Sequence, residues 1–270
     1  MEIQQTVVEN QDSSTMTKID LTRYNEVYFT GDIHGEFRKF TYSIVTQLGL
    51  RDCLVVVCGD IGMGFYKRGY YADEFQRMQK KLSEVNVTAV MFRGNHDNPD
   101  YFDSEEFSEY QYDGAYPNVY LVPDLTILET CVGKALCVGG ALSIDRSMRT
   151  EGVSWWSNEK MVLPTETEFE EISKESIDIV ATHCCPLVCG PRFNDAMGFE
   201  NVDKFIMSEL QNERMDFDDL LYALKAKNPI KQWFYGHFHG HYSDWIDNVR
   251  FIGLDMLRNS GADLYKAIKL

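Results

Sequence analysis

Apolar and polar positions between Glu26 and Phe92 alternate between two patterns. Apolar, largely β-branched runs at 27–30, 54–57 and 87–92 predict buried strands. Between them, apolar residues recur at helical spacing in two stripes, Phe37, Phe40, Ile44, Val45 and Leu48, then Phe75, Met78, Leu82 and Val85. Strands that alternate with helices predict β-α-β units with parallel strands.

After Pro117 the pattern changes to short, closely spaced strands at 119–122, 125–132 and 135–138, which predicts hairpins. Thr165 and Glu168 form a capping box that predicts a helix start after Pro164. The pattern then predicts a strand at 177–181 and a helix with an apolar face of Phe217, Leu220, Leu221 and Leu224. It ends with predicted strands at 232–235, 249–252 and 264–268. We therefore expect one α/β domain over residues 23–270, with two sheets between helical layers, preceded by a flexible polar tail over residues 1–22.

The composition indicates a globular protein and disfavours several other classes. Apolar residues make up 44% of the 270 residues and charged residues 25%, which suffices for a large core. The 26 Lys and Arg against 42 Asp and Glu give a charge of -16, which disfavours nucleic acid and anionic lipid as partners. The longest apolar run, Cys53–Cys58, cannot span a bilayer, and the first residues lack an apolar signal segment, so we expect a cytoplasmic protein. The seven cysteines contain no CxxC pair and are expected to be buried thiols in a reducing compartment.

Polar clusters follow several of the predicted strands. GDIHG at Gly31–Gly35, GD at Gly59–Asp60 and RGNHD at Arg93–Asp97 each end a strand, and His183 and GHFH at Gly236–His239 follow two later strands. Ligands bind beyond the carboxyl ends of parallel strands, so we expect one pocket to be lined by Asp32, His34, Asp60, Asn95, His96 and Asp97.

Five of the six histidines fall in these clusters. A single histidine beside a strand is usually an ordinary core or surface residue. Carboxylates and imidazoles crowded together in a water-poor crevice, however, stay unsatisfied unless a cation lies between them. The clusters therefore predict a metal site, and the mixture of O and N donors favours Mn, Fe, Ni, Co or Zn over Ca.

The order of these blocks, DxH, GD, GNHD, H and GHxH, resembles that of the calcineurin-like metallophosphoesterase superfamily from Gly31 to His239. The resemblance implies a four-layer αββα sandwich, in which two mixed β-sheets flanked by helices carry two divalent metal ions at the strand ends, with Mn as the first expectation. It further implies that Asp32, His34 and His239 bind one ion. Asn95, His183 and His237 would bind the other, and the Asp60 carboxylate would bridge the two.

The same resemblance implies the reaction. A hydroxide between the two ions would hydrolyse a phosphomonoester or small phosphodiester, such as a nucleotide, while His96 protonates the leaving group. Asp97 is expected to orient His96 and raise its pKa, with a helix N-cap before Pro99 as the alternative role.

The phosphate oxygens of a substrate also need hydrogen-bond donors, and guanidinium groups bind phosphate bidentately. The candidates are Arg93, Arg146 and Arg149, of which the last two lie in the segment Gly139–Trp156. The alternative interpretation of that segment is a structural loop with a surface Asp-Arg pair and two packed tryptophans.

Two other functions are compatible with the motifs. A nuclease of the same superfamily would need a basic groove, and the first half of the chain contains the basic pairs Lys67-Arg68 and Lys80-Lys81. A catalytically silent metal-binding scaffold for a partner protein is the other. The complete ligand set together with His96 favours the enzyme.

Overall fold

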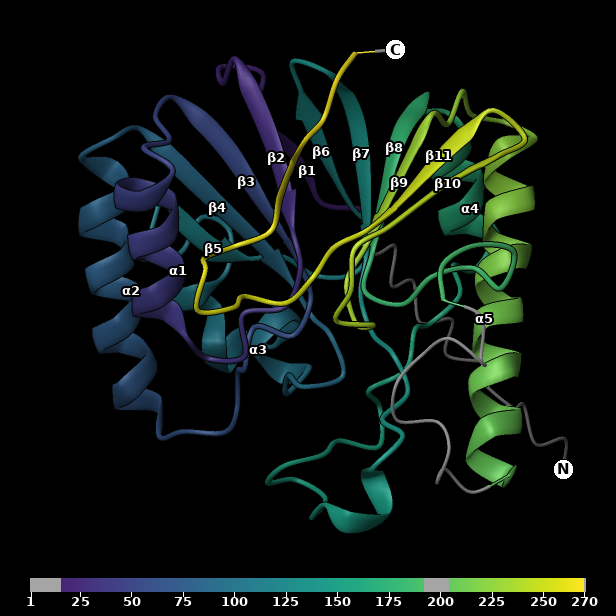
Figure 1. Ribbon diagram of the computed structural model, residues 1–270, viewed down its shortest axis with the longest axis horizontal. Coiled ribbons are helices and arrows are strands. Elements are labelled where there is room, and N and C mark those ends of the chain that lie inside the picture. Colours follow the sequence, from purple (N-terminus) through teal and green to yellow (C-terminus); the bar gives the residue numbers. More distant parts are fainter. Residues whose placement is uncertain (1–15, 192–203, 270) are drawn as a thin grey trace, which may run out of the picture.

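The computed structural model describes residues 16–191 and 204–269. Two β-sheets pack face to face, and helices cover both outer faces (Figure 1). The strand order is β12-β2-β3-β4-β5 in one sheet and β1-β6-β7-β8-β9-β11-β10 in the other. Each sheet contains parallel and antiparallel pairs. The expected four-layer αββα sandwich with two mixed sheets is confirmed.

The five-stranded sheet is formed by the alternating first part of the chain and a strand near the C-terminus. Its members are β2 (Glu26–Thr30), β3 (Cys53–Cys58), β4 (Val87–Phe92), β5 (Val119–Leu121) and β12 (Leu264–Lys266). The strands β2 to β5 are parallel, as the β-α-β pattern predicted. Its outer face is covered by α1 (Phe37–Tyr42), which continues as a π-helical turn over Ser43–Gln47, and by α2 (Arg68–Ser83).

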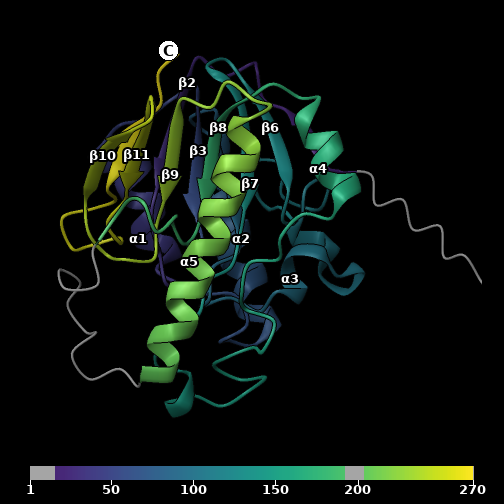
Figure 2. The ribbon, with the colours of Figure 1, turned by 90° about the vertical axis from the view of Figure 1, so that its right-hand side faces the viewer.

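The seven-stranded sheet contains β1 (Lys18–Asp20), β6 (Thr126–Thr130), β7 (Gly133–Val138), β8 (Ile177–Thr182), β9 (Gln232–Tyr235), β10 (Tyr242–Ile246) and β11 (Val249–Gly253). Figure 2 shows α4 (Glu166–Ser173) and α5 (Lys204–Lys225) over its outer face. The capping box at the start of α4 is confirmed, since Thr165 Oγ1 accepts the Glu168 N–H and Glu168 accepts the Thr165 N–H. Short helical turns occur at α3 (Asp100–Asp103), Glu105–Tyr110 and Arg146–Met148.

Side chains of alternating strand residues separate the interior into layers. In β3, Cys53, Val55 and Val57 pack with residues of α1 and α2, whereas Leu54, Val56 and Cys58 pack between the sheets. Phe29 of β2 stacks on Phe234 of β9 with ring centroids 4.0 Å apart. Burial on both faces explains why these strands are continuously apolar.

The expected flexible tail is partly wrong. Residues 1–15 lie outside the described residues, but β1 pairs in parallel with β6. Ile19 and Leu21 alternate with polar residues and are each 1% exposed in the layer between the sheets. Burial of these two side chains attaches the segment to the sheet edge.

Two expectations from composition can be compared with the structure. No helix within residues 16–191 and 204–269 is long and apolar enough to cross a bilayer. All cysteines are free thiols, and all except Cys131 are buried. Cys184 and Cys185 pack in the core beside α5.

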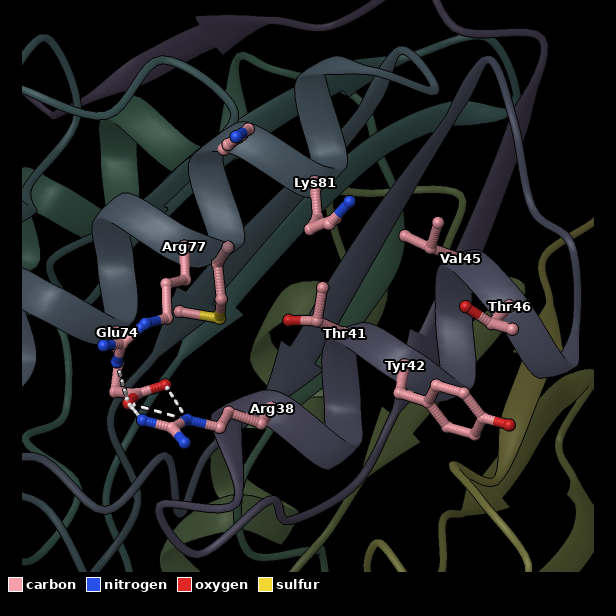
Figure 3. A pocket seen from close by; sticks show the side chains of 10 residues that line it. Arg38, Thr41, Tyr42, Val45, Thr46, Glu74, Arg77 and Lys81 are labelled. Atoms are coloured by element: carbon pink, nitrogen blue, oxygen red, sulfur yellow. Dashed lines mark hydrogen bonds and ion pairs between the residues drawn. The ribbon is translucent and has the colours of Figure 1, made fainter.

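A groove of about 490 Å³ lies between α1 and α2 on the outer face of the molecule (Figure 3). The buried Glu74 carboxylate accepts hydrogen bonds from Arg38 and Arg77, with N–O distances of 2.7 Å to each. None of the residues predicted for the functional site lines this groove. The Arg38–Glu74 pair connects the two helices, whereas the Arg77–Glu74 pair lies within α2.

Candidate metal centre

The seven side chains predicted as metal ligands come together at the ends of five strands. Four follow β2, β3 and β4 of the five-stranded sheet, and the other three follow β8 and β9 of the seven-stranded sheet. The centre therefore lies where the carboxyl ends of the two sheets meet. The sixth histidine, His241, lies apart from it and contacts Asp263.

Glycines next to these residues allow the close approach. A Cβ on Gly59 would lie 2.2 Å from His183 Nδ1, and a Cβ on Gly94 would lie 2.2 Å from Asp60 Oδ1. Contacts that short do not occur between real atoms, so any larger residue would displace the imidazole or the carboxylate. The glycines before the polar clusters are thus required by packing.

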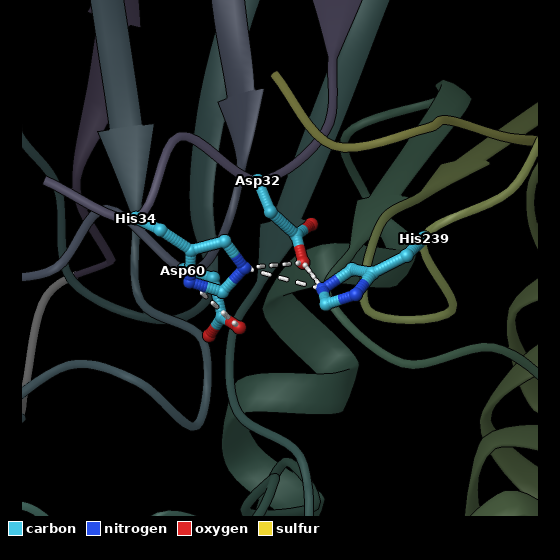
Figure 4. Close-up of side chains that lie close together, drawn as sticks. All are labelled: Asp32, His34, Asp60 and His239. Atoms are coloured by element: carbon cyan, nitrogen blue, oxygen red, sulfur yellow. Dashed lines mark hydrogen bonds and ion pairs between the residues drawn. The ribbon is translucent and has the colours of Figure 1, made fainter. Parts of the chain in front are cut away.

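The first ligand group consists of Asp32, His34 and His239, with Asp60 beside it (Figure 4). One potential ligand atom from each of these four side chains lies within 4.8 Å of the others. Asp32 Oδ2 is 2.9 Å from His239 Nε2 and 3.6 Å from His34 Nε2, yet it is buried and has no hydrogen bond of acceptable geometry. A buried carboxylate oxygen in this state fits a cation.

The second ligand group consists of Asn95, His183 and His237. Asn95 Oδ1 lies 3.0 Å from both His183 Nε2 and His237 Nδ1, and His183 Nε2 lies 3.1 Å from Asp60 Oδ1. His183 Nδ1 is 2.7 Å from the carbonyl oxygen of Cys58, which can only accept, so Nδ1 carries the hydrogen. In a neutral imidazole the Nε2 lone pair then faces two oxygens, an arrangement that a shared cation satisfies.

The electrostatics of the centre favour positive charge. Burial raises the pKa of Asp32 and Asp60, but the neighbouring imidazoles outweigh it and hold both below the usual value. Burial alone would lower the pKa of His183, but Asp60 raises it to about 9. Burial and His183 lower the pKa of His237 to about 3. Two buried carboxylates within reach of four imidazoles suit divalent cations.

Four of the predicted ligands have left-handed backbone conformations. The φ angles are 45° at His34, 51° at Asp60, 67° at His237 and 48° at His239. Such conformations cost free energy in residues with a Cβ and are concentrated at functional sites. Hydrogen bonds stabilise them, because His34 N–H donates to Asp60 O at 2.9 Å and His237 N–H donates to Asp32 Oδ1 at 3.0 Å.

His96 lies at the mouth of the centre. Its backbone N–H donates to Asp60 Oδ1 at 2.7 Å, and its ring centroid is 5.1 Å from that of His34. The two imidazoles line a pocket of about 160 Å³ together with Gly62, Phe65 and Tyr66. Burial lowers the pKa of His96, and Asp60 opposes this effect.

The prediction that Asp97 orients His96 is wrong. The Asp97 carboxylate accepts four backbone N–H groups at 2.8 to 3.0 Å, from Ile61, Gly62, Met63 and Gly94. The alternative helix-cap role is wrong as well, since Pro99 is the N-cap of α3. Burial and Asp60 raise the pKa of Asp97 to about 7 against the effect of the N–H donors. Because each oxygen accepts two N–H groups, we assign the ionised form.

We expect Asp97→Asn to lower the free energy of unfolding by about 3 kcal/mol, since an amide NH₂ would face two backbone N–H donors in the interior. Urea denaturation measures the change. The matched control is Asp113→Asn at an exposed turn, which should change stability by less than about 0.5 kcal/mol. Equal stability of the two variants would show that the loop around Gly62 does not depend on this carboxylate.

Two of the three predicted phosphate-binding arginines contact other parts of the chain. Arg93 is buried and donates to Asp124 Oδ2 at 2.6 Å and to the carbonyls of Glu159 and Lys160 at 2.8 and 2.9 Å. Arg146 pairs with Glu209 on α5. The predicted substrate role of Arg93 is therefore wrong, because a carboxylate and carbonyls already occupy its guanidinium group. The role of Arg146 stays a prediction.

Arg149 is the one predicted arginine beside the pocket. Its Nη2 lies 2.9 Å from His96 Nε2, and its Nη1 lies 3.2 Å from His96 Nδ1. Asp145 accepts from its Nε and Nη2 at 2.7 and 2.8 Å. The Asp-Arg pair of this segment thus faces His96.

Four residues of this region were not identified from the sequence. Ser143 and Glu159 lie next to Asn95 in the interior, and Phe65 and Tyr66 line the His96 pocket. Ser143 belongs to the marked segment Gly139–Trp156, whereas Phe65 and Tyr66 lie beyond the Gly59–Asp60 motif. Glu159 has no local signal, since its contact depends on the path of the chain.

Comparisons with known proteins bear on the family and the fold of this chain. The family model of the calcineurin-like phosphoesterases matches residues 26–241, and no curated protein matches the sequence significantly. The solved structure of TT1561 from Thermus thermophilus is similar with a TM-score of 0.53 at 12% identity, over 91% of this chain and 99% of that chain. A dimetal phosphatase from Danio rerio gives 0.47 at 11% identity, over 87% and 88%. The first similarity supports the fold alone.

Proposed function

Since the chain belongs to the calcineurin-like phosphoesterase family, we propose that it hydrolyses a phosphomonoester or small phosphodiester with two divalent metal ions. The observation that carries this proposal is the pair of facing ligand groups with Asp60 between them. Asp60 Oδ1 lies 3.1 Å from His183 Nε2, and its Oδ2 lies 3.9 Å from His34 Nδ1. One carboxylate is thus directed toward both groups.

In this proposal Asp32, His34 and His239 hold one ion, Asn95, His183 and His237 hold the other, and Asp60 contacts both. When bound, such ions lower the pKa of water toward neutrality and neutralise charge on phosphate oxygens. The donor set of carboxylate, amide and imidazole supports Mn, with Fe, Ni, Co and Zn as alternatives.

His96 is the proposed general acid that protonates the leaving oxygen. Its ring is beside the first ligand group and open to the pocket. A bound phosphate would raise the pKa of His96 by its negative charge, which favours the protonated form needed for the transfer. Asp97 supports this position indirectly, since it holds the backbone on both sides of the pocket.

Arg149 is the proposed phosphate ligand among the three arginines. Asp145 binds one edge of its guanidinium and thereby fixes the plane of the group next to His96. A planar guanidinium in a fixed orientation recognises phosphate oxygens better than a flexible ammonium group.

Turnover of p-nitrophenyl phosphate and bis(p-nitrophenyl) phosphate, each with Mn²⁺ and with excess chelator, tests the proposal. We expect hydrolysis of at least one ester that requires the metal and returns when the metal is restored. Stoichiometric metal binding without hydrolysis of either ester would instead support the catalytically silent scaffold.

A further inference from the structure

Two exposed aromatic side chains form one wall of the pocket that contains His96. Phe65 is 37% exposed and Tyr66 is 55% exposed, and both line the pocket of about 160 Å³ with the two histidines. Exposed aromatic groups that gather at a polar pocket are typical of binding sites.

The surrounding residues hold this wall in place. Phe65 packs edge-on against Trp156 at 5.4 Å between ring centroids, and Tyr66 packs on Tyr70 at 4.5 Å. The Tyr71 hydroxyl accepts the Tyr66 N–H at 3.0 Å and donates to Gly62 O at 2.9 Å. A wall that is rigid before binding loses little entropy when a ligand is bound.

The position of the wall follows from the role of His96. The Phe65 ring centroid is 6.2 Å from that of His96, with an angle of 21° between the ring planes. A leaving oxygen that takes a proton from His96 must lie within hydrogen-bond reach of its imidazole. The remainder of the leaving group is then next to Phe65.

We propose that Phe65 and Tyr66 bind the leaving group and that this group carries a planar aromatic ring, so that the substrate is a nucleoside phosphate. This inference rests on the proposed function. The ribose separates the ester oxygen from the base, which allows the base to stack on a ring beside the acid. Stacking on aromatic side chains recognises any base, because every base has a π face.

Binding of two matched ligands tests the wall separately from catalysis. The ligands are methylenephosphonate analogues of AMP and of ribose 5-phosphate, which bind but cannot be hydrolysed because a CH₂ replaces the ester oxygen. Calorimetry on the Mn²⁺-loaded protein should show the AMP analogue binding at least about tenfold more tightly. Phe65→Leu and Tyr66→Leu should each reduce this ratio about fivefold.

Tyr42→Leu is the matched control, because Tyr42 has the same 55% exposure but lies in the groove between α1 and α2. It should leave the ratio unchanged. Equal affinities for the two ligands, or a ratio that survives both wall variants, would overturn the aromatic wall and leave the phosphoesterase proposal intact. Failure of the proposed function would appear instead as absent turnover in the ester assay.

A separate observation concerns how the side chain of Asn95 is oriented. Asn95 Nδ2 donates to Ser143 Oγ at 2.9 Å, while its Oδ1 faces His183 and His237. The two ends of an amide are similar in size, so packing alone does not prevent a flip that would turn NH₂ toward the imidazoles.

Glu159 determines which group donates in the hydrogen bond between Asn95 and Ser143. It is 1% exposed, and its carboxylate accepts from Ser143 N–H at 2.8 Å and from Ser143 Oγ at 2.5 Å. An ionised carboxylate only accepts, so the Ser143 hydroxyl donates to it and keeps a lone pair for the amide of Asn95. Arg93 anchors the backbone of Glu159, as described above.

We infer that Ser143 and Glu159 are positioning residues that direct Asn95 Oδ1 toward the second ligand group. Ser143→Ala should weaken binding of one of the two ions by about 10- to 100-fold, the usual effect of losing a partner of a metal ligand. Calorimetry with Mn²⁺ measures both affinities without relying on turnover. Glu159→Gln should act in the same direction, because one of its termini can no longer accept.

The Asn95→Asp background separates positioning from structural support. In that background both ends of the side chain are oxygens, so a flip changes nothing and Ser143→Ala should alter the affinity less than threefold. Ser173→Ala, which removes a hydroxyl that donates to Phe169 O on α4, is the matched control and should alter neither affinity. The same loss from Ser143→Ala in both backgrounds, or no loss in either, would overturn this inference.

Discussion

Asp60→Asn should reduce metal-dependent turnover by about 10³-fold or more, because several kcal/mol of charge stabilisation by the ions is lost. The two oxygens of Asp60 are directed toward different ligand groups. An amide presents only one oxygen and no charge, so neither group retains its shared ligand. Calorimetry with Mn²⁺ should therefore show both binding events weakened, alongside the loss of rate.

The substitution keeps the shape of the side chain, and circular dichroism together with urea denaturation verifies that the variant is folded. Asp113→Asn at the exposed turn serves again as the control and should retain both ions and full turnover. A folded Asp60→Asn protein with two tightly bound ions and unchanged turnover would refute the assignment of Asp60 as the shared ligand.

His96→Asn should retain both ions but lose about 10²- to 10⁴-fold in rate with alkyl phosphates, the range expected when a general acid is removed. With p-nitrophenyl phosphate the loss should be much smaller, since this leaving group departs as a stable anion and needs no proton. The ratio of the two losses isolates proton donation from phosphate binding, which affects both esters alike.

His241→Asn is the matched control, because His241 contacts Asp263 away from the centre. It should leave both rates unchanged. If His96→Asn hydrolysed an alkyl phosphate as fast as the parent protein, His96 would not be the general acid.

The location of the centre followed from the sequence because its residues are local to strand ends. Gly59-Asp60 directly follows a buried apolar run, and a parallel sheet brings such positions to one edge. The strands β3 and β4 could also be predicted, since strands buried on both faces are continuously apolar. The short strands β1 and β10 at the edges of the seven-stranded sheet were not found, because three to five half-exposed residues give little periodicity.

The directions of individual side chains could not be predicted in the same way. Arg93 and Asp97 lie beside predicted site residues, and their types suit phosphate binding and histidine orientation. Both side chains instead hold other parts of the chain in place. Arg93 donates to Asp124 and to the carbonyl of Glu159. Asp97 accepts from backbone amides of the loop after β3. These partners are 31 to 66 residues away, so only the folded chain shows that the groups are occupied.

The most direct test of the two-ion centre is anomalous diffraction from crystals grown with Mn²⁺. We expect two peaks about 3.5 to 4 Å apart, the usual separation of ions that share a bridging ligand. One should lie among Asp32, His34 and His239 and the other among Asn95, His183 and His237, with Asp60 between them. A single peak, or none at saturating Mn²⁺, would contradict the account.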